Sequence, residues 1–535
     1  MTEPIDSHAR RTRWLDVGLA LVLFGGVVLY QRALPPSLGA ADESYLFYHG
    51  RRVLEGQVPY RDFTDLVTPA SFYLVAAVFA LFGTSMQVAR LLSGAIDGGI
   101  AVALFAACRL LGAGRGLAVA APVAQVVLFQ PAWPYASPHW LSTLLALGLL
   151  LGLLRPLVRG TAPSAALLGI QSGALVLVAQ QRGAILAVGI PALVLLDGLV
   201  TRALGAAPPI RHGVAWFLRY VAAGALVVIP GLGLVIAAAG FAPVWEALVM
   251  YPLRNYATTI HAPRWGFVAY VTAGYARETF PVVLRWLPIA LAIDVVGLAA
   301  AAWRRDVIRT RRLVLLLAFS GLVVASVWYF HDFIHIAFIA PVLLVAVVEL
   351  IDAATRALPS ARAARGAAGA VAVAVLVVAL VHGVRIQTAR ARAFPVMHQT
   401  AFGEVALPDA AHARLVDRLR ELADAAGTDE LFSYPSNARF YLLTGLHNPT
   451  RFSWLQYGYS QPEAYAEVIR VLEERQTPLV AVTAPFLKPD DPFLAWLITR
   501  YTRLEDTETE QATGIVVYGR GAITANVPAV PHSVD

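Results

Sequence analysis

The chain has 535 residues, of which 58% are hydrophobic and only 14% are charged. A soluble globular domain usually has about 25% charged residues, so this composition leaves too little polar surface for a water-soluble particle. The formal net charge of +7 does not indicate nucleic-acid binding, because the basic residues fall in short clusters between long apolar runs. The single cysteine, Cys108, excludes an intrachain disulfide bond.

Long apolar runs recur from Trp14 to Val384, and each of them is a candidate bilayer span. We predict about eleven spanning helices from these runs. The predicted spans cover residues 14–33, 86–108, 116–131, 138–154, 163–179, 183–201, 220–240, 286–303, 313–330, 334–354 and 367–384. Charged residues return after His382, which predicts a separate soluble domain. We therefore expect an N-terminal segment (1–13), a membrane domain (14–384) and a soluble C-terminal domain (385–535).

Arginine clusters between the runs indicate the orientation, because cytoplasmic loops are enriched in Lys and Arg. All the clusters lie on one side of the membrane if the short apolar run 69–83 does not cross it. At 1.5 Å per residue, this run covers about 22 Å of a hydrocarbon core that is roughly 30 Å thick. We expect a structured first external loop (34–85) with a juxtamembrane or re-entrant helix. The N-terminus is then cytoplasmic and the C-terminal domain extracytoplasmic.

The first external loop begins with two adjacent carboxylates, Asp42 and Glu43. Adjacent carboxylates at a membrane surface are costly unless they are solvated, paired or metal-bound. On composition alone, a solvated loop with salt bridges and a reactive site remain open alternatives. Arg61 and Asp62 follow in the same loop and are candidates for substrate or phosphate binding.

Histidines stand at two further external positions. His139 lies at the mouth of a predicted span, where it is either a hydrogen-bonded residue of the helix end or a metal ligand. If their segment is helical, His331 and His335 lie on one helix face at i, i+4. That spacing suits a metal or a phosphate, and it equally suits a polar turn between two helices.

The external loop from Phe241 to Arg285 is rich in aromatic residues and also contains Arg254 and Arg264. Aromatic residues at this depth are typical of an interfacial belt. Arginine side chains match the oxygens of a phosphate group, so these two arginines are candidates for phosphate binding. Both interpretations remain open.

The soluble C-terminal region alternates between two kinds of pattern. Strand-like segments at 431–434, 478–482 and 515–518 are separated by helical segments at 462–475 and 492–501. This alternation predicts a small α/β domain.

Several loop features together resemble the GT-C class of membrane glycosyltransferases. The acidic pair is followed by LEGQVPYRDF, by a proline-started apolar helix that ends in LFGTS, and by Arg90 at the start of the next span. Pro138-His139 and the stretch HDFIHIAFIAP add to the pattern. It is most similar to the branch that uses lipid-phosphate sugars, which includes protein O-mannosyltransferases and aminoarabinose transferases. The resemblance covers residues 10–350 in layout.

The resemblance implies that a sugar is moved, with inversion, from a polyprenyl-phosphate donor to a glycan, lipid or protein acceptor. The reaction is expected at the outer face of the bacterial cytoplasmic membrane. Asp42, with Glu43 beside it, would accept the proton of the attacking hydroxyl group. A divalent metal ion, Mg or Mn, held by Asp42 and His139 is a further expectation.

The leaving group of such a transfer is a phosphate ester, whose charge needs cationic partners. The residues expected to supply them are Arg254, Arg264, His331 and His335. One element of the family pattern is missing. Val67-Thr68-Pro69 stands where some relatives carry Lys-Pro-Pro, so the phosphate-binding lysine is absent.

Two functions from other classes are alternatives. A transporter or flippase of lipid-linked sugars would need charged residues along a path through the spans, whereas here they concentrate at one membrane face. A non-catalytic envelope assembly protein would bind a partner through its C-terminal domain. In that protein, replacement of Asp42 would have no effect on function.

Overall fold

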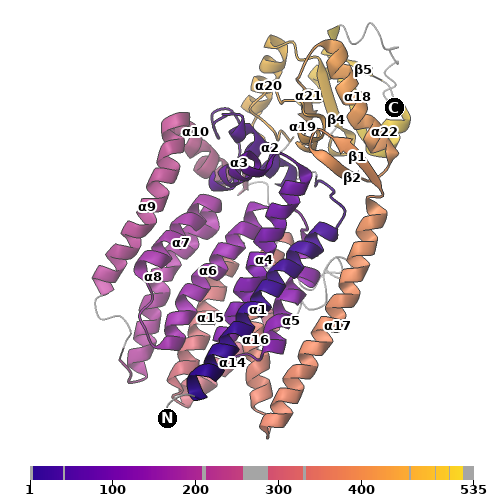
Figure 1. Cartoon of the computed structure of the whole chain (residues 1–535). Helices are drawn as coiled ribbons and strands as arrows, with labels where there is room; N and C mark the ends of the chain where they lie inside the picture. Colours follow the sequence, from indigo (N-terminus) through magenta and orange to yellow (C-terminus); the bar gives the residue numbers. More distant parts are fainter. Residues whose placement is uncertain are drawn as a thin grey trace.

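The structure is a computed structural model. It describes residues 4–39, 42–207, 213–256, 287–328, 333–435, 437–456, 460–487, 490–504 and 507–521. Figure 1 shows a bundle of long helices that carries a smaller domain of strands and short helices at one end. The N-terminal end of α1 (Pro4–Ala33) lies at the opposite end of the bundle.

Apolar helices build the bundle, and the protein is a multi-pass membrane protein. In the described ranges, seven helices are long and apolar enough to cross a membrane. They are α1, α4 (Met86–Leu110), α6 (Pro138–Arg159), α8 (Gln180–Ala203), α9 (Gly213–Ala239), α16 (Phe333–Arg356) and α17 (Ala361–Ala393). The other bundle helices are α5 (Arg115–Ala124), α7 (Ala165–Val178), α14 (Leu287–Trp303) and α15 (Val307–Ala325). Each predicted span overlaps one of these helices, although the runs 116–131 and 313–330 extend beyond the ends of α5 and α15. The predicted fold class, a polytopic helical membrane protein, is confirmed.

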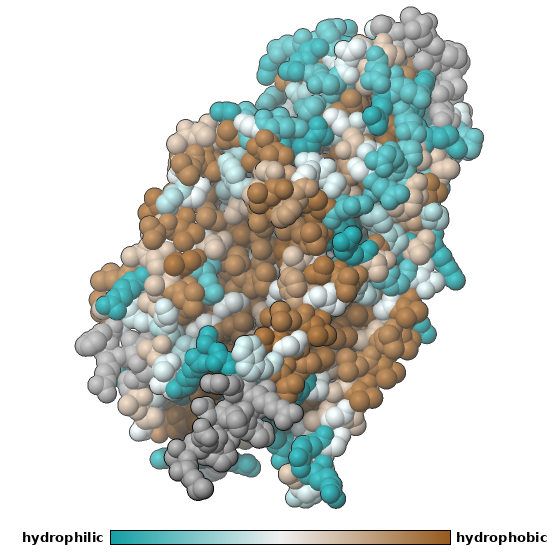
Figure 2. All heavy atoms as spheres, viewed as in Figure 1, coloured by the Kyte–Doolittle hydropathy of each residue, from teal (hydrophilic) through white to brown (hydrophobic). Residues whose placement is uncertain are grey.

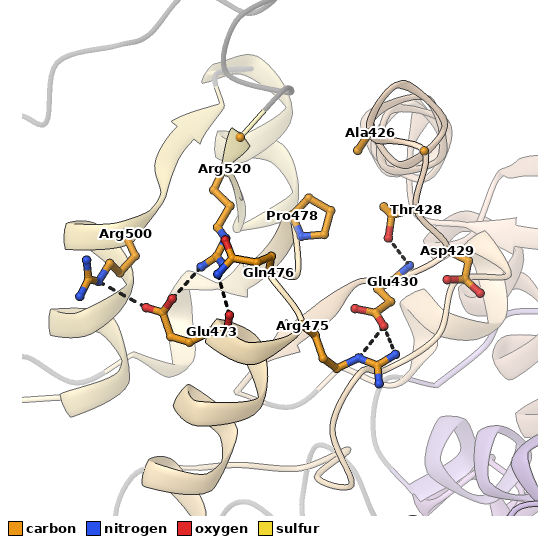
Figure 3. A pocket seen from close by; sticks show the side chains of 12 residues that line it. Ala426, Thr428, Asp429, Glu430, Glu473, Arg475, Gln476, Pro478, Arg500 and Arg520 are labelled. Carbon is orange, nitrogen blue, oxygen red and sulfur yellow. Dashed lines mark hydrogen bonds and ion pairs between the residues drawn. The ribbon is translucent and has the colours of Figure 1, made fainter.

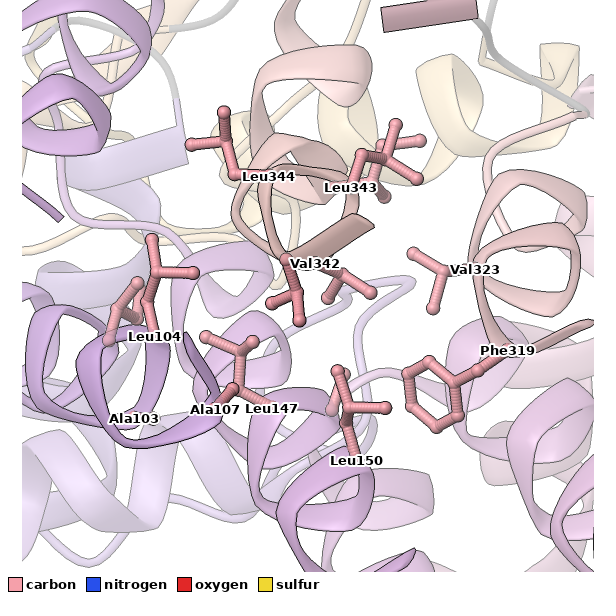
Figure 4. Close-up of a cluster of buried hydrophobic side chains, with 14 of the residues drawn as sticks. Ala103, Leu104, Ala107, Leu147, Leu150, Phe319, Val323, Val342, Leu343 and Leu344 are labelled. Atoms are coloured by element: carbon pink, nitrogen blue, oxygen red, sulfur yellow. The ribbon is translucent and has the colours of Figure 1, made fainter. Parts of the chain in front are cut away.

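The surface of the bundle is apolar, as contact with lipid requires. Apolar side chains gather over the bundle in Figure 2, whereas polar side chains cover the C-terminal domain. Inside the bundle, α4, α6, α15 and α16 pack through fully buried side chains. Figure 4 shows this core, which includes Leu104, Leu147, Phe319 and Leu343. The helices are thereby fixed relative to one another, and so are the loops at their ends.

The first loop, between α1 and α4, contains two helices, α2 (Asp42–Leu54) and α3 (Ala70–Phe82), at the end of the bundle next to the C-terminal domain (Figure 1). With 13 residues, α3 is too short to span a bilayer. It packs closely on α2, because a Cβ atom at Gly50 would lie 2.2 Å from Val75 Cγ1. The run 69–83 is therefore a helix of the first loop, as its length predicts.

The C-terminal domain is an α/β domain, as predicted. β1 (Val396–Thr400) and β2 (Gly403–Leu407) form an antiparallel pair. A second sheet has the order β3-β4-β6-β5, in which β3 and β4 are parallel and the other pairs antiparallel. Its strands are β3 (Phe432–Tyr434), β4 (Leu479–Thr483), β5 (Thr502–Leu504) and β6 (Ile515–Gly519). The helices are α18 (Ala410–Ala426), α19 (Arg439–Thr444), α20 (Pro462–Glu474), α21 (Pro492–Arg500) and α22 (Thr507–Thr513).

Candidate active site

A cavity of about 950 Å³ lies where the first loop, the end of the bundle and the C-terminal domain meet. Four of the predicted site residues line it: Asp42, His139, Arg254 and His335. The lining does not include Glu43, Arg61 or Asp62. The remaining two, Arg264 and His331, lie outside the described residues. The structure therefore brings together residues from four separate parts of the sequence.

One face of α2 forms part of the cavity wall. Asp42, Tyr45, Leu46 and His49 line the cavity, and their spacing of three or four residues places them on one helix face. Asp42 is the first residue of α2 and is exposed. Asp42 thus lies at a helix N-terminus, a position that stabilises a nearby negative charge.

Glu43 lies on the other side of α2 and is fully buried. Its Oε1 accepts hydrogen bonds from Arg90 Nη1 at 2.7 Å and from the Ala136 backbone N–H at 2.9 Å. Its Oε2 accepts a hydrogen bond from the Gly39 backbone N–H at 2.8 Å. Glu43 thus joins α2 to α4 and to the segment ahead of α6, which fixes the direction in which Asp42 points.

Arg61 and Asp62 form an exposed ion pair away from the cavity. Arg61 Nη2 and Asp62 Oδ2 are 2.8 Å apart, and Asp62 also accepts a hydrogen bond from the Val58 backbone N–H at 2.7 Å. The hydrogen bond from Arg61 lowers the pKa of Asp62. These contacts stabilise the turn between α2 and α3, and the position does not contact the space where a substrate would lie.

Two histidines meet at the bundle end of the cavity. α6 begins at Pro138, and its N-cap Ser137 accepts a hydrogen bond from the His139 backbone N–H. This places the imidazole of His139 5.0 Å from that of His335, measured between ring centroids. Phe338 stacks on His139 with its ring centroid at 4.8 Å.

The residues near these histidines do not form a site for a metal ion. No three His, Cys, Asp or Glu side chains of the described chain come close enough to hold one. The aromatic ring stacked on His139 adds no ligand. Mg and Mn favour oxygen ligands, whereas the pair of rings supplies only nitrogen. We therefore assign no reaction step to a metal ion at Asp42 and His139.

Arg182 is a cavity residue that sequence reasoning missed. It lies in the first turn of α8 and is only 3% exposed. Its Nη1 donates to Ser142 Oγ at 2.6 Å and to Thr143 Oγ1 at 3.0 Å, and its Nε donates to Ser326 Oγ at 3.3 Å. These three partners are hydroxyl oxygens, and they hold the guanidinium group in place.

The interruption between α7 and α8, just before Arg182, places a helix N-terminus with its partial positive charge beside the cavity. Ala179 alone separates α7 from α8, with an extended backbone (φ −151°), and no side chain caps the start of α8. Gln180 and Gln181 line the cavity with Arg182, so the uncapped N-terminus of a 24-residue helix borders it. Such a terminus attracts anions. The sequence signal was the polar triplet Gln-Gln-Arg between two apolar runs.

Arg254 lines the cavity on a π-helical turn after α10 (Phe241–Trp245). It is exposed, and its Nη1 lies 3.3 Å from Glu246 Oε1. Nearby, Tyr251 makes an edge-to-face contact with Trp454 of the C-terminal domain, with ring centroids 6.5 Å apart. The charge of Arg254 is therefore partly neutralised by Glu246.

A chain of three polar side chains joins α2 to the C-terminal domain beside the cavity. His49 Nδ1 lies 2.8 Å from Asp65 Oδ2, and His49 Nε2 lies 2.9 Å from Ser453 Oγ. The imidazole is buried and stacks on Phe63 with a centroid distance of 4.4 Å. Burial lowers the pKa of His49, while the hydrogen bond with Asp65 opposes this effect. We interpret the chain as a structural connection.

A second cavity, of about 800 Å³, lies within the C-terminal domain (Figure 3). Its charged groups pair with one another: Arg475 with Glu430, and both Arg500 and Arg520 with Glu473. Since each arginine already has a carboxylate partner, this cavity offers little to a charged substrate. The first cavity is the better candidate for an active site.

Comparisons with known proteins bear on the fold. No protein-family model matches the sequence, and no curated protein matches it. Among solved structures, the chain is similar to the crystal structure of ArnT from Cupriavidus metallidurans bound to undecaprenyl phosphate. The identity is 14%, the TM-score is 0.59, and the match covers 97% of this chain and 100% of that chain. The apo structure of the same ArnT gives 15% identity and a TM-score of 0.54, covering 98% and 100%. The chain thus has the ArnT fold, which confirms the resemblance to the GT-C class at the level of fold.

Proposed function

We propose that the protein is a membrane glycosyltransferase that transfers a sugar from a polyprenyl-phosphate donor to a hydroxyl group of an acceptor. The transfer takes place at the outer face of the bacterial cytoplasmic membrane, with the N-terminus in the cytoplasm. The observation that carries this proposal is the joint presence of Asp42, Arg182 and the α8 N-terminus in the wall of one cavity. The undecaprenyl phosphate bound to ArnT, which has the same fold, supports a lipid-phosphate donor.

Asp42 is the proposed general base. The acceptor hydroxyl loses its proton to the carboxylate of Asp42 while its oxygen bonds to the anomeric carbon of the sugar. The bond between that carbon and the phosphate oxygen breaks on the opposite face, so the configuration inverts. Glu43 cannot replace Asp42 in this step, because its two oxygens are occupied by Arg90 and by two backbone N–H groups.

Arg182 and the start of α8 are the proposed site of the leaving phosphate. The phosphate gains negative charge as its bond to the sugar breaks, and fixed donors in a water-poor site stabilise such charge best. Arg182 is held by three hydroxyl groups, so it needs little rearrangement when the charge develops. This assignment also supplies the cation that the sequence lacks at Val67-Thr68-Pro69.

The C-terminal domain is the proposed acceptor side. Its segment from Arg451 to Gln456 and the first turns of α20 form the wall opposite the bundle. Trp454 with Tyr251 provides an aromatic surface there, and Glu463 provides a hydrogen-bond acceptor. The acceptor class, whether glycan, lipid or protein, follows from the test below rather than from these contacts.

The test compares purified full-length protein with its Asp42→Asn variant on a panel of radiolabelled polyprenyl-phosphate sugars. The release of polyprenyl phosphate is measured. The expected loss of turnover in the variant is about 100-fold or more, because a general base contributes 10²–10⁴-fold. Asp424→Asn, an exposed position on α18, is the matched control and should retain full turnover.

Equal turnover in wild type and Asp42→Asn would remove Asp42 from the mechanism. Absence of turnover with every donor, in wild-type protein shown to be folded, would contradict the transferase proposal. In that case, transport of the labelled lipid across proteoliposomes is the next measurement. Labelled acceptors recovered from turnover reactions identify the acceptor class.

A further inference from the structure

Two arginines near the outer end of the bundle have no hydrogen-bond partner in the described part of the chain. Arg390 lies in the last turn of α17, and Arg439 is the first residue of α19. In the described residues, no oxygen accepts a hydrogen bond from either guanidinium group, and Arg439 Nε is buried without a partner. Both groups are only partly exposed.

The two arginines share one neighbour, Tyr135. The guanidinium carbon of Arg390 lies 5.5 Å from the ring centroid of Tyr135. Arg439 is within electrostatic reach of the same tyrosine, and its guanidinium carbon lies 5.4 Å from the Phe440 ring centroid. Cation–π contacts of this kind stabilise a cation only modestly, by about 0.5–2 kcal/mol, and they satisfy none of its N–H donors.

The surrounding groups add further positive charge. Arg90, which is 7% exposed, binds Glu43 through Nη1 and Nη2, yet its Nε is buried and has no partner. Arg390 is within electrostatic reach of both Arg90 and Glu43. Arg90 and Arg390 therefore share a single nearby carboxylate, Glu43, and that carboxylate is already hydrogen-bonded to Arg90.

Two charged donors of this cluster, Arg90 Nε and Arg439 Nε, are buried without a hydrogen bond, and such donors are expensive in a protein interior. Native proteins rarely leave such groups unsatisfied, and a bound anion is one partner that can satisfy them. A guanidinium fork matches two oxygens of one phosphate group, so a phosphate is the partner that satisfies several of these donors together.

The position of the cluster indicates where the phosphate comes from. α17 and α1 meet here, because Gln387 Nε2 donates to the Tyr30 carbonyl at 3.4 Å. Below that contact, Leu29 and Val384 are 69% and 58% exposed on the lipid-facing surface of the two helices. Arginines at the outer end of a lipid-facing helix lie at the depth of lipid headgroups.

We propose that Arg390 and Arg439, beside Tyr135 and Arg90, bind the phosphate group of a membrane lipid whose chains lie along α1 and α17. The lipid is either a phospholipid of the outer leaflet or a polyprenyl phosphate, since both present the same phosphate chemistry. This site is separate from the 950 Å³ cavity, whose lining contains none of these four residues. The proposal does not depend on the transferase activity.

Bound lipid phosphate would brace the first loop. It would bridge α17 and α19 beside Arg90, which holds Glu43 and through it the N-terminal end of α2. The site would thus tie the position of Asp42 to the plane of the headgroups.

The test measures lipid binding to full-length protein in detergent by native mass spectrometry. Dioleoyl phosphatidylglycerol, undecaprenyl phosphate and an uncharged diglucosyl diacylglycerol are added in separate titrations. The variants are Arg390→Gln and Arg439→Gln, and the matched control is Arg385→Gln, an exposed position on α17. Wild type and control should bind the phosphate lipids, and each variant should lose about tenfold or more in affinity, as expected for lost charge-assisted hydrogen bonds.

The two phosphate lipids distinguish the source. Variant-sensitive binding of phosphatidylglycerol assigns the site to a phospholipid, and variant-sensitive binding of undecaprenyl phosphate assigns it to a polyprenyl carrier. Equal binding by wild type and variants, or equally tight binding of the uncharged lipid, would overturn the proposal. Arg390→Lys and Arg439→Lys keep the positive charge and lose the planar guanidinium group, and they replace the glutamine variants if those unfold. The lipid affinity of the lysine variants should lie between that of wild type and that of the glutamine variants.

Discussion

Arg90 Nη1 donates a 2.7 Å hydrogen bond to Glu43 Oε1, and the two side chains are 8% and 0% exposed. This buried pair gives two adjacent carboxylates opposite surroundings. Glu43 is fixed in the protein interior, and its neighbour Asp42 faces the cavity. The acidic pair at the start of α2 therefore consists of one anchoring residue and one candidate reactive residue.

Replacing Glu43 by glutamine should destabilise the protein strongly. The amide cannot neutralise Arg90, and leaving one partner of a buried ion pair without the other costs about 3–5 kcal/mol. Unfolding of the purified protein by denaturant in detergent measures the effect. Glu421→Gln, whose side chain is 67% exposed and pairs with Arg418, is the control and should change stability by about 0.5 kcal/mol or less. A stable Glu43→Gln variant would show that the pair does not anchor α2.

Arg182→Gln should slow sugar transfer with a smaller effect on folding than on turnover. A fixed donor aimed at developing charge contributes about 10²–10³-fold to the rate, so turnover should fall by that factor. Arg182→Lys keeps the charge and loses the planar fork, and its turnover should lie between wild type and Arg182→Gln. Arg219→Gln, an exposed position on α9, is the control. Full turnover in Arg182→Gln would mean that the leaving phosphate is bound elsewhere.

Gly183→Ala should displace the start of α8. A Cβ atom at this position would lie 2.4 Å from the Cα and 2.5 Å from the backbone nitrogen of Val176, a contact that backbone atoms cannot relieve without moving. Arg182 would move with the helix end, so turnover should fall even though no cavity side chain is changed. Gly198→Ala, with open space around the new methyl group on the same helix, should be neutral or slightly stabilising. Normal activity of Gly183→Ala would show that the α7–α8 junction tolerates the shift.

The contact between α2 and the C-terminal domain should weaken in acid. Burial lowers the pKa of His49, so the unfolded chain, with a His pKa of about 6.5, takes up the proton first as the pH falls. The stability that neutral His49 contributes is therefore complete above about pH 6.5 and decreases as the pH falls from there toward the folded-state pKa. Unfolding of wild type and His49→Gln at pH 8 and pH 5.5 measures this. The difference between the two proteins should shrink at pH 5.5, and a difference that grows would contradict the assignment.

The sequence indicated most of the architecture, because span length and arginine placement are strong signals. The apolar strands β3, β4 and β6 were also predicted within one or two residues. β1 was missed because VMHQT mixes polar and apolar residues in a short edge pair, and β5 has only three residues. These strands depend on their neighbours in space, which local pattern does not reveal.

The candidate site was less predictable. Asp42 and His139 were chosen for the loops on which they lie, and the structure places both in the cavity wall. The pairing of Glu43 with Arg90 spans 47 positions, and no local pattern records it. Arg182 lies between two apolar runs, a position that by sequence is typical of an ordinary loop residue. Only the structure shows that a single residue separates α7 from α8 and that Arg182 lies in the first turn of α8.

α17 has 33 residues, which makes it about 50 Å long, whereas the hydrocarbon core is about 30 Å thick. The C-terminal end of α17 is followed within three residues by β1, so the C-terminal domain is attached directly to this helix and not through a long linker (Figure 1). A thicker bilayer or a different tilt of this helix would change the position of the C-terminal domain relative to the bundle, and these two parts form opposite walls of the cavity. Under the proposed function, the turnover of the protein would then depend on the thickness of the membrane.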